Sequence, residues 1–330
     1  MYYVRSHITL PMMVLQVPVR DAPMSAKAAN SAFLKAEAQV YANYSLAPRS
    51  RELRLHKLSL MIRAVDVGAG EPALFLHGFS LTGAHWAPLM ARLPKLHCTA
   101  IDMPGHGSSD GVNYKGVDLR RWYVDMLTSC LDELGLESAH IIGHSQGAMF
   151  GLWLALDAPT RVRSLIAIGT PAVAFGAHLE SLKMLARPGI GRLMLSMPKP
   201  SSMYRGVLVR TIGRQEVDAA PEALIRTTYL ATQRPNFGMT VSTYLREMFA
   251  GAQAEPPRYV LSATELAQIH RPALIVWGEN DDHYQPIAEA RAKAALMPNA
   301  QFEVVPGGHE PWLADLEPSA NIISAFLASH

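Results

Sequence analysis

Residues 139–153, with the sequence AHIIGHSQGAMFGLW, decide the fold of this chain. An apolar run rich in β-branched residues leads into Gly143-His144-Ser145-Gln146-Gly147, and a run rich in Ala, Met and Leu follows. This pattern predicts a strand, a sharp turn and a helix. Small residues on both sides of Ser145 let the strand and the helix approach closely. We therefore expect Ser145 on a strained turn with its hydroxyl exposed, as in a nucleophile elbow.

A second stretch fits the same G-x-S-x-G pattern. Gly107-Ser108-Ser109-Asp110-Gly111 lies between two polar, glycine-containing segments, without an apolar run before it or a helical pattern after it. Because a nucleophile elbow needs a strand on one side and a helix on the other, the context favours Ser145 over Ser109.

Composition narrows the class of protein. The chain has 330 residues, of which 49% are hydrophobic, which is enough for one large domain or a domain with an insertion. The net charge is +2, and Lys and Arg are spread along the sequence, which argues against a nucleic-acid partner. The two cysteines, Cys98 and Cys130, provide neither a disulfide framework nor metal-ligand spacing. We expect buried free thiols in a reducing compartment and no bound metal.

The first 50 residues are predicted to form an extension and a helix. Residues 8–19 are apolar, but Pro11, Gln16 and Pro18 interrupt them, and the run is too short to span a membrane. We therefore expect a cytoplasmic protein without stable membrane insertion rather than a secreted one. Met24 is an alternative start, which would place residues 1–23 outside the mature protein. The alanine-rich stretch 25–44 has apolar positions at helical spacing, which predicts an amphipathic helix against the main body.

From residue 51 onward, apolar strand patterns alternate with helical patterns. The predicted strands are 53–65, 73–76, 98–102, 139–142, 162–168, 273–277 and 301–305. This alternation predicts a mostly parallel, doubly wound α/β sheet covered on both faces. It stops between residues 171 and 258, where helical periods, turn residues and six of the 16 methionines occur. We predict a core domain of residues 51–170 and 259–330 with a helical lid inserted at 171–258.

Two loops after predicted strands offer partners for Ser145. A serine hydroxyl needs a base within hydrogen-bond reach and a carboxylate that holds this base in the correct tautomer. Residues 278–283, GENDDH, follow one strand, and residues 306–312, PGGHEPW, follow the next. Because the carboxyl ends of parallel strands meet at one edge of the sheet, Ser145, an aspartate and His309 are expected to converge there.

Five short motifs in this order resemble the α/β-hydrolase family, and the resemblance extends from about residue 53 to the C-terminus. They are HGF at 77–79, DMPGHGSS at 102–109, GHSQG at 143–147, WGEND at 277–281 and GGHEP at 307–311. The resemblance implies the α/β-hydrolase fold and a cofactor-free reaction. By it, Ser145 is the nucleophile, His309 the general base and then acid, and Asp281 the orienting carboxylate.

The same resemblance implies that the backbone N–H groups of Phe79 and Gln146 form an oxyanion hole. The acid departs from the usual spacing: counting forward from Gly278 selects Asp281, whereas counting back from Pro286 selects Asp282. We prefer Asp281, because the sheet holds the position just after a strand and an insertion is absorbed further along the loop.

Several other polar residues near these motifs have a structural interpretation. His77 is expected to shape the oxyanion loop, and His106 and His144 to be hydrogen-bonded beside the pocket. Asp102 is expected to fix its loop by accepting local backbone N–H groups. Glu310 is expected to be solvated, with placement of the base as the alternative, and His283 to lie on the surface. The candidate substrate pocket comprises His144, Met149, Met184, Met203 and Phe237.

The predicted function is hydrolysis of a small-molecule carboxylic ester through an acyl-enzyme. Carbon–carbon bond hydrolysis of a diketone and lactone hydrolysis are enzymatic alternatives, and a small-molecule receptor on the same fold is an alternative of another class. Residues 171–258 contain eleven Lys and Arg against six Asp and Glu. An apolar, methionine-rich pocket under a basic exterior favours an ester with a hydrophobic acyl or aryl part.

Overall fold

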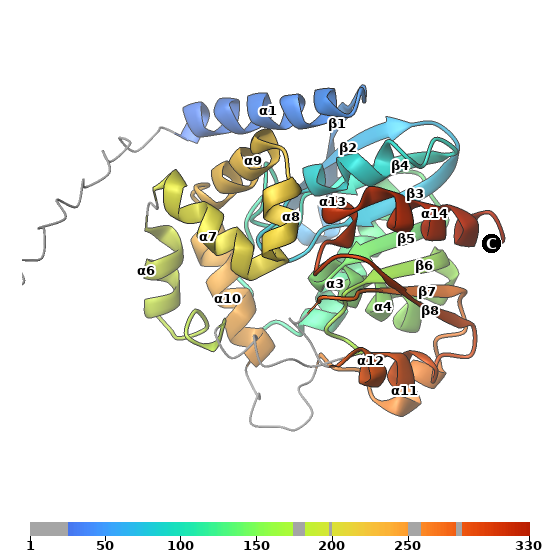
Figure 1. The fold of residues 1–330 in the computed structure, drawn as a ribbon. Helices are drawn as coiled ribbons and strands as arrows, with labels where there is room; N and C mark the ends of the chain where they lie inside the picture. The colour runs from blue at the N-terminus through green and yellow to red at the C-terminus, as the bar shows by residue number, and fades with distance from the viewer. Residues whose placement is uncertain (1–25, 174–181, 198–199, 250–258, 282–285) are drawn as a thin grey trace, which may run out of the picture.

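The computed structural model describes residues 26–173, 182–197, 200–249, 259–281 and 286–330, and it contains one central sheet (Figure 1). The sheet has eight strands in the order β1-β2-β4-β3-β5-β6-β7-β8. Their bounds are β1 Arg49–Leu55, β2 Leu60–Gly68, β3 Glu71–Leu76, β4 Leu96–Ile101, β5 Ala139–His144, β6 Val162–Ile168, β7 Ala273–Gly278 and β8 Ala300–Val305. From β4 to β8 all neighbours are parallel, as predicted.

The first edge of the sheet differs from the prediction. The single strand expected at 53–65 is wrong, because β1 and β2 form an antiparallel pair that turns at residues 56–59. Ser59 at the end of this turn is left-handed, with φ of 49°, which reverses the chain. β2 also pairs antiparallel with β4. Leu55 and Leu58 flank the polar pair His56-Lys57, so the apolar residues on the two sides of the turn resemble one continuous strand.

Helices cover both faces of the sheet (Figure 1). Buried side chains of α3, α4 and α12 belong to one hydrophobic cluster, and those of α2, α13 and α14 belong to the cluster on the other face. The bounds of these helices are α2 Ala87–Met90, α3 Leu119–Glu133, α4 Gln146–Asp157, α12 Ile287–Ala294, α13 Pro311–Ala314 and α14 Leu316–Leu327. The short α11, Ala263–Ala267, precedes β7. Cys98 and Cys130 are buried and free in β4 and α3, as predicted.

A helical region is inserted between β6 and β7 and lies to one side of the sheet (Figure 1). Its helices are α6 Ile190–Ser196, α7 Ser201–Ile212, α8 Arg214–Ala219, α9 Glu222–Thr232 and α10 Phe237–Phe249. Residues 174–181 and 250–258 lie outside the described residues, so the exact boundaries 171 and 258 stay predictions. None of the described helices is both long and apolar enough to cross a membrane.

Helix α1, Ala26–Asn43, lies across both parts of the molecule (Figure 1). Its buried residues Ala29, Phe33, Ala36 and Val40 recur at helical spacing, which confirms the predicted amphipathic helix. The helix packs against α9 of the inserted region, and Val40 joins the cluster under β3 and β4. Residues 1–25 lie outside the described residues.

Candidate active site

Ser145 occupies the turn between β5 and α4, and its backbone is strained. Its φ of 51° and ψ of −116° lie outside the regions that non-glycine residues ordinarily adopt. Its N–H donates to the carbonyl of Ile168 at the end of β6, at 2.8 Å. The neighbouring strand therefore fixes the turn. Ser109 lies in a loop, bonded to Arg63 N–H and to the Asp102 carbonyl, and has no such geometry.

The two glycines of the motif allow the tight turn. A Cβ atom on Gly147 would lie 2.2 Å from the carbonyl oxygen of Leu76 in β3, and one on Gly143 would lie 2.6 Å from the backbone nitrogen of Ala148. Neither position has room for a side chain, because strand and helix backbones meet there. The sequence-based explanation for these residues is therefore confirmed.

His309 and Asp281 meet at the carboxyl ends of β7 and β8. The His309 Nδ1 lies 2.7 Å from the Asp281 Oδ2, and both side chains are buried. Because a carboxylate only accepts hydrogen bonds, this contact places a proton on Nδ1 and leaves Nε2 for another partner. Backbone bonds from Glu279 to Val305 and from Asn280 to Gly307 hold the two loops together. Asp282 lies outside the described residues, as does His283.

Ser145 and His309 line one cavity of about 800 Å³ between the sheet edge and the inserted helices. His144, Met184 and Phe237 of the predicted pocket also line it, together with Phe79. Two other predicted pocket residues do not. Met149 lies on α4 and is fully buried in the hydrophobic core. Met203 lies on α7 and is 63% exposed.

Glu310 is the centre of a buried network behind His309, so its predicted solvation is wrong. Its carboxylate lies 2.9 Å from His85 Nδ1, and His85 Nε2 lies 2.7 Å from the Thr228 hydroxyl. That hydroxyl donates its own proton to the carbonyl of Leu224 at 2.8 Å. Because the Thr228 hydroxyl gives its proton to Leu224, it accepts from His85 Nε2, while the Glu310 carboxylate faces His85 Nδ1. A chain of hydrogen bonds thus connects Glu310 to α9.

His144 connects this network to the loop of the base. Its Nε2 donates to the backbone carbonyl of His309 at 2.8 Å, and its Nδ1 lies 3.5 Å from Glu310 Oε1. Burial, followed by the neighbouring His309, lowers the pKa of His144 well below its usual value. The predicted structural role is confirmed. His144 directly precedes Ser145. Its side chain therefore connects the turn that carries Ser145 to the loop that carries His309.

Glu216 is a site residue that the sequence interpretation missed. It lies on α8, is buried, lines the cavity and accepts a hydrogen bond from the backbone N–H of Gly308, next to His309. Burial raises its pKa. A lone glutamate in a helical stretch carries no motif, so only the fold reveals that it reaches the loop of the base.

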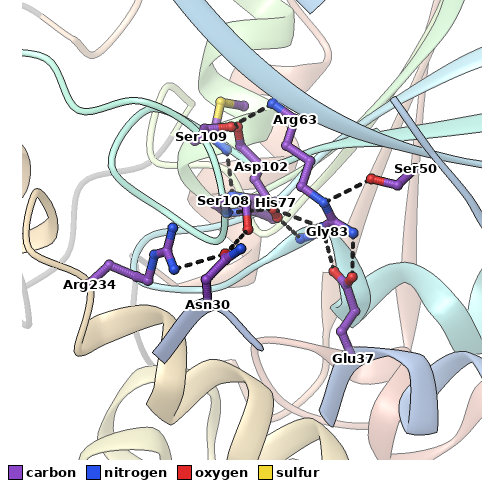
Figure 2. A network of polar contacts seen from close by, with 11 residues as sticks. Asn30, Glu37, Ser50, Arg63, His77, Gly83, Asp102, Ser108, Ser109 and Arg234 are labelled. Carbon is purple, nitrogen blue, oxygen red and sulfur yellow. Dashed lines mark hydrogen bonds and ion pairs between the residues drawn. The ribbon is translucent and has the colours of Figure 1, made fainter. Parts of the chain in front are cut away.

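A second buried polar network fixes the loop after β4, residues 102–109 (Figure 2). Asp102 accepts from the backbone N–H groups of Gly83 and Ser108 at 3.0 and 3.2 Å, which confirms its predicted loop-fixing role. It also accepts from Arg63 Nη1 at 3.2 Å, and Arg63 is bonded in turn to Glu37 of α1. Burial opposes the charge of Asp102, but Arg63 and the N–H donors outweigh it, so the pKa of Asp102 is lowered.

The histidines of this region have structural roles, as predicted. His77 Nε2 accepts from the backbone N–H of Met103 at 2.8 Å, and its Nδ1 donates to the carbonyl of Gly78. Burial, followed by the charge of His106, lowers the pKa of His77 to about 3. His106 donates to the carbonyl of Pro104. His77 is therefore neutral and holds the segment that leads to Phe79.

The predicted oxyanion donors belong to the segment after β3 and to the start of α4. Phe79 lines the cavity, and Gln146 is the first residue of α4, where backbone N–H groups have no partner within the helix. Among the described residues, no group of three His, Cys, Asp or Glu side chains is placed to hold a metal ion.

Comparison with known proteins places the chain in a family. A family profile described as "Alpha/beta hydrolase family" matches residues 73–322. A 2-hydroxy-6-oxononadienedioate/2-hydroxy-6-oxononatrienedioate hydrolase of Pseudomonas putida is 27% identical over 288 residues, covering 84% of this chain and 96% of the relative. A 2-hydroxymuconate semialdehyde hydrolase of Pseudomonas putida is 28% identical over 273 residues, covering 80% and 89%.

A solved structure shares the fold. The carboxylesterase CesB from Bacillus subtilis superposes with a TM-score of 0.74 at 19% sequence identity, covering 92% of this chain and 99% of that chain. At this identity the likeness concerns the fold alone.

Proposed function

Because this chain belongs to the alpha/beta hydrolase family, we propose that it is a serine hydrolase that cleaves carboxylic esters without a cofactor. The observation that supports this most directly is the 2.7 Å contact between His309 Nδ1 and Asp281 in a cavity that Ser145 also lines. In this proposal Ser145 is the nucleophile, His309 the general base and Asp281 the orienting carboxylate.

The reaction has two halves. Ser145 Oγ attacks the ester carbonyl carbon while His309 Nε2 takes the hydroxyl proton, and the C–O bond to the alcohol breaks as His309 returns this proton to the leaving oxygen. Water then attacks the acyl-enzyme, with His309 as base, and releases the acid and free Ser145. The backbone N–H groups of Phe79 and Gln146 stabilise the oxyanion in both halves.

The lining of the cavity supports a hydrophobic ester. Leu182, Leu185, Leu195, Val207 and Phe237 line it, and they provide an apolar surface for an acyl chain or an aryl ring. We therefore propose short- to medium-chain aryl esters as substrates, with weak or no activity on peptides.

Carbon–carbon bond hydrolysis is the second candidate. The two Pseudomonas putida relatives carry names of hydrolases acting on hydroxy-oxo acids. Arg210 and Arg214 also line the cavity, and a guanidinium suits the carboxylate of such an acid. A lactone is a third substrate class for the same chemistry.

A substrate panel separates these functions. We expect the wild-type protein to turn over aryl butyrates. Ser145→Ala is expected to lower kcat by at least about a thousandfold. Ser129→Ala, on α3 away from the cavity, is the control and is expected to leave kcat unchanged. Rapid cleavage of a vinylogous diketone with no aryl ester turnover would assign the carbon–carbon reaction instead. Tight binding with fewer than a few turnovers would assign a receptor.

A further inference from the structure

Exposed apolar side chains are concentrated in one short segment of the inserted region. Among the described residues, eight large hydrophobic side chains are exposed, and six of them lie between residues 184 and 203. These six are Met184, Ile190, Leu193, Met194, Met197 and Met203. We call them, together with Arg187 and Arg192, the α6 surface.

Helix α6 presents an apolar stripe to the outside. Ile190, Leu193, Met194 and Met197 follow the spacing i, i+3, i+4 and i+7, which places them on one side of the helix. Gly191 is buried against the backbone of Leu185, and Ser196 approaches Gly238 where α6 packs against α10. In Figure 1, α6 lies at the outer edge of the molecule, on the far side of α10 from the sheet. One side of α6 thus packs against α10, and the apolar stripe on another side stays exposed.

The charge around this stripe has one sign. Between Glu180 and Glu216 the sequence contains seven Lys and Arg and no Asp or Glu. Arg187, just before α6, and Arg192, within it, are exposed. Arg205, in contrast, pairs with Glu222 at 3.0 Å, so it is excluded from the α6 surface. An exposed apolar stripe in a segment whose only charged residues are cations is the composition of a helix that lies on an anionic interface.

The α6 surface is also a rim of the substrate cavity. Met184 and Met194 line the cavity and are 50% and 37% exposed, respectively. The same side chains therefore touch both the cavity and the outside. A partner seated on the α6 surface would be next to the cavity in which Ser145 lies.

We propose that the α6 surface docks on an anionic lipid surface. The stripe of Ile190, Leu193, Met194 and Met197 enters the headgroup region, and Arg187 and Arg192 contact anionic headgroups. A second copy of the chain fits less well, because a symmetric contact would bring two sets of cations together without an acid between them. Docking is peripheral, requires no membrane span, and does not depend on the proposed ester hydrolysis.

Vesicle binding of the full-length Ser145→Ala protein tests this proposal without interference from turnover. We expect co-sedimentation with vesicles of mixed phosphatidylglycerol and phosphatidylcholine, at least about tenfold weaker binding to phosphatidylcholine alone, and weakening by salt. The double variant Leu193→Ser/Met197→Ser is expected to lose about tenfold in affinity for the anionic vesicles. Leu296→Ser removes an equally large side chain that is 41% exposed elsewhere, and it is the matched control.

The charges are tested in the same assay. Arg187→Gln/Arg192→Gln is expected to weaken binding to anionic vesicles by about tenfold, whereas Arg54→Gln on the exposed edge strand β1 changes it little. Equal binding to both kinds of vesicle, or anionic binding that survives the stripe and arginine variants, would overturn the proposal. A dimer in sedimentation equilibrium that Leu193→Ser/Met197→Ser dissociates, without vesicle binding, would assign the α6 surface to a second copy.

Discussion

Two buried polar networks support the candidate site, and they are built from different groups. The network of Figure 2 contains Arg63 bonded to the carboxylates of Glu37 and Asp102. The network behind the base contains three histidines, His85, His144 and His309, held by carboxylates. One network is held together by a guanidinium between carboxylates, and the other by imidazole rings that contact carboxylates and backbone carbonyls.

The difference indicates a division of tasks. Arg63 and Asp102 connect α1, β2 and the loop after β4, so their bonds hold distant parts of the chain in place. The histidine network instead surrounds the loop that carries His309, the proposed base. We expect substitutions in the first network to lower stability and substitutions in the second to lower activity.

The largest expected effect is that of Asp281→Asn. Without a carboxylate on Nδ1, His309 can adopt the wrong tautomer, and kcat is expected to fall by about ten thousandfold while the melting temperature changes little. Circular dichroism melting and ester kinetics on the same preparations measure both quantities. Asp282→Asn is the matched control and is expected to keep most activity. A greater loss for Asp282→Asn than for Asp281→Asn would reverse the two assignments.

The opposite pattern is expected for Asp102→Asn. Removing this charge leaves Arg63 buried beside one carboxylate, and the free energy of unfolding is expected to fall by about 3–5 kcal/mol. Chemical denaturation measures it, with the exposed pair Arg54–Glu52 as control, where Arg54→Gln is expected to change stability by less than about 1 kcal/mol. The folded variant is expected to keep most of its kcat.

The pH dependence of this loss follows from the direction of the pKa shift. The pKa of Asp102 is lowered in the folded state, so its contribution is fully present above the unfolded value of about 3.9. It disappears as the pH falls through the lower, folded value. The stability difference between wild type and Asp102→Asn is therefore expected to be constant at neutral pH and to shrink in strong acid. A difference that grows on acidification would contradict this account.

The sequence predicted the parts of the fold that depend on local patterns. The strand, turn and helix around Ser145 follow from apolar periodicity and two glycines, and the alternation of strands and helices sets the parallel part of the sheet. The β1–β2 turn was missed because residues 56–59 contain neither Gly nor Pro and apolar residues resume directly after His56-Lys57.

The candidate site was predictable only where motifs mark it. His309 and Asp281 follow strand ends, so topology brings them together, whereas Glu216 comes from an inserted helix whose docking no local pattern encodes. Met149 and Met203 were misplaced because helical spacing alone does not tell which side of α4 or α7 faces the cavity. Glu310 was misplaced because its partner His85 is distant in sequence.

A smaller effect is expected for Glu310→Gln. The amide keeps the shape but not the charge opposite His85, and a hydrogen bond between charged groups contributes about 1.5–3 kcal/mol. We expect kcat/KM to fall by roughly ten- to a hundredfold, together with a shift of its pH profile, because Glu310 positions His309 through His144. Glu303→Gln, on the exposed side of β8, is the matched control. An unchanged pH profile with only a lower melting temperature would give Glu310 a structural role alone.

The smallest expected effect is that of Asn30→Ala. Asn30 lies where the network of Arg63 and Asp102 meets the inserted region (Figure 2). Asn30 Oδ1 accepts hydrogen bonds from the Ser108 hydroxyl and from Arg234 Nη1, both at 2.9 Å. Ser108 belongs to the loop that Asp102 holds, and Arg234 lies just before α10, whose first residue, Phe237, lines the cavity.

Because Asn30 connects the loop to the inserted region, its loss is expected to cost about 0.5–1.5 kcal/mol of stability. We also expect a rise of a few-fold in KM for a bulky aryl ester, with kcat unchanged, since the chemistry lies in the other network. Asn43→Ala, which removes an exposed hydrogen bond from Gln39 at the far end of the same helix, is the matched control. A fall in kcat as large as that of Glu310→Gln would show that the two networks are coupled and would break the division between them.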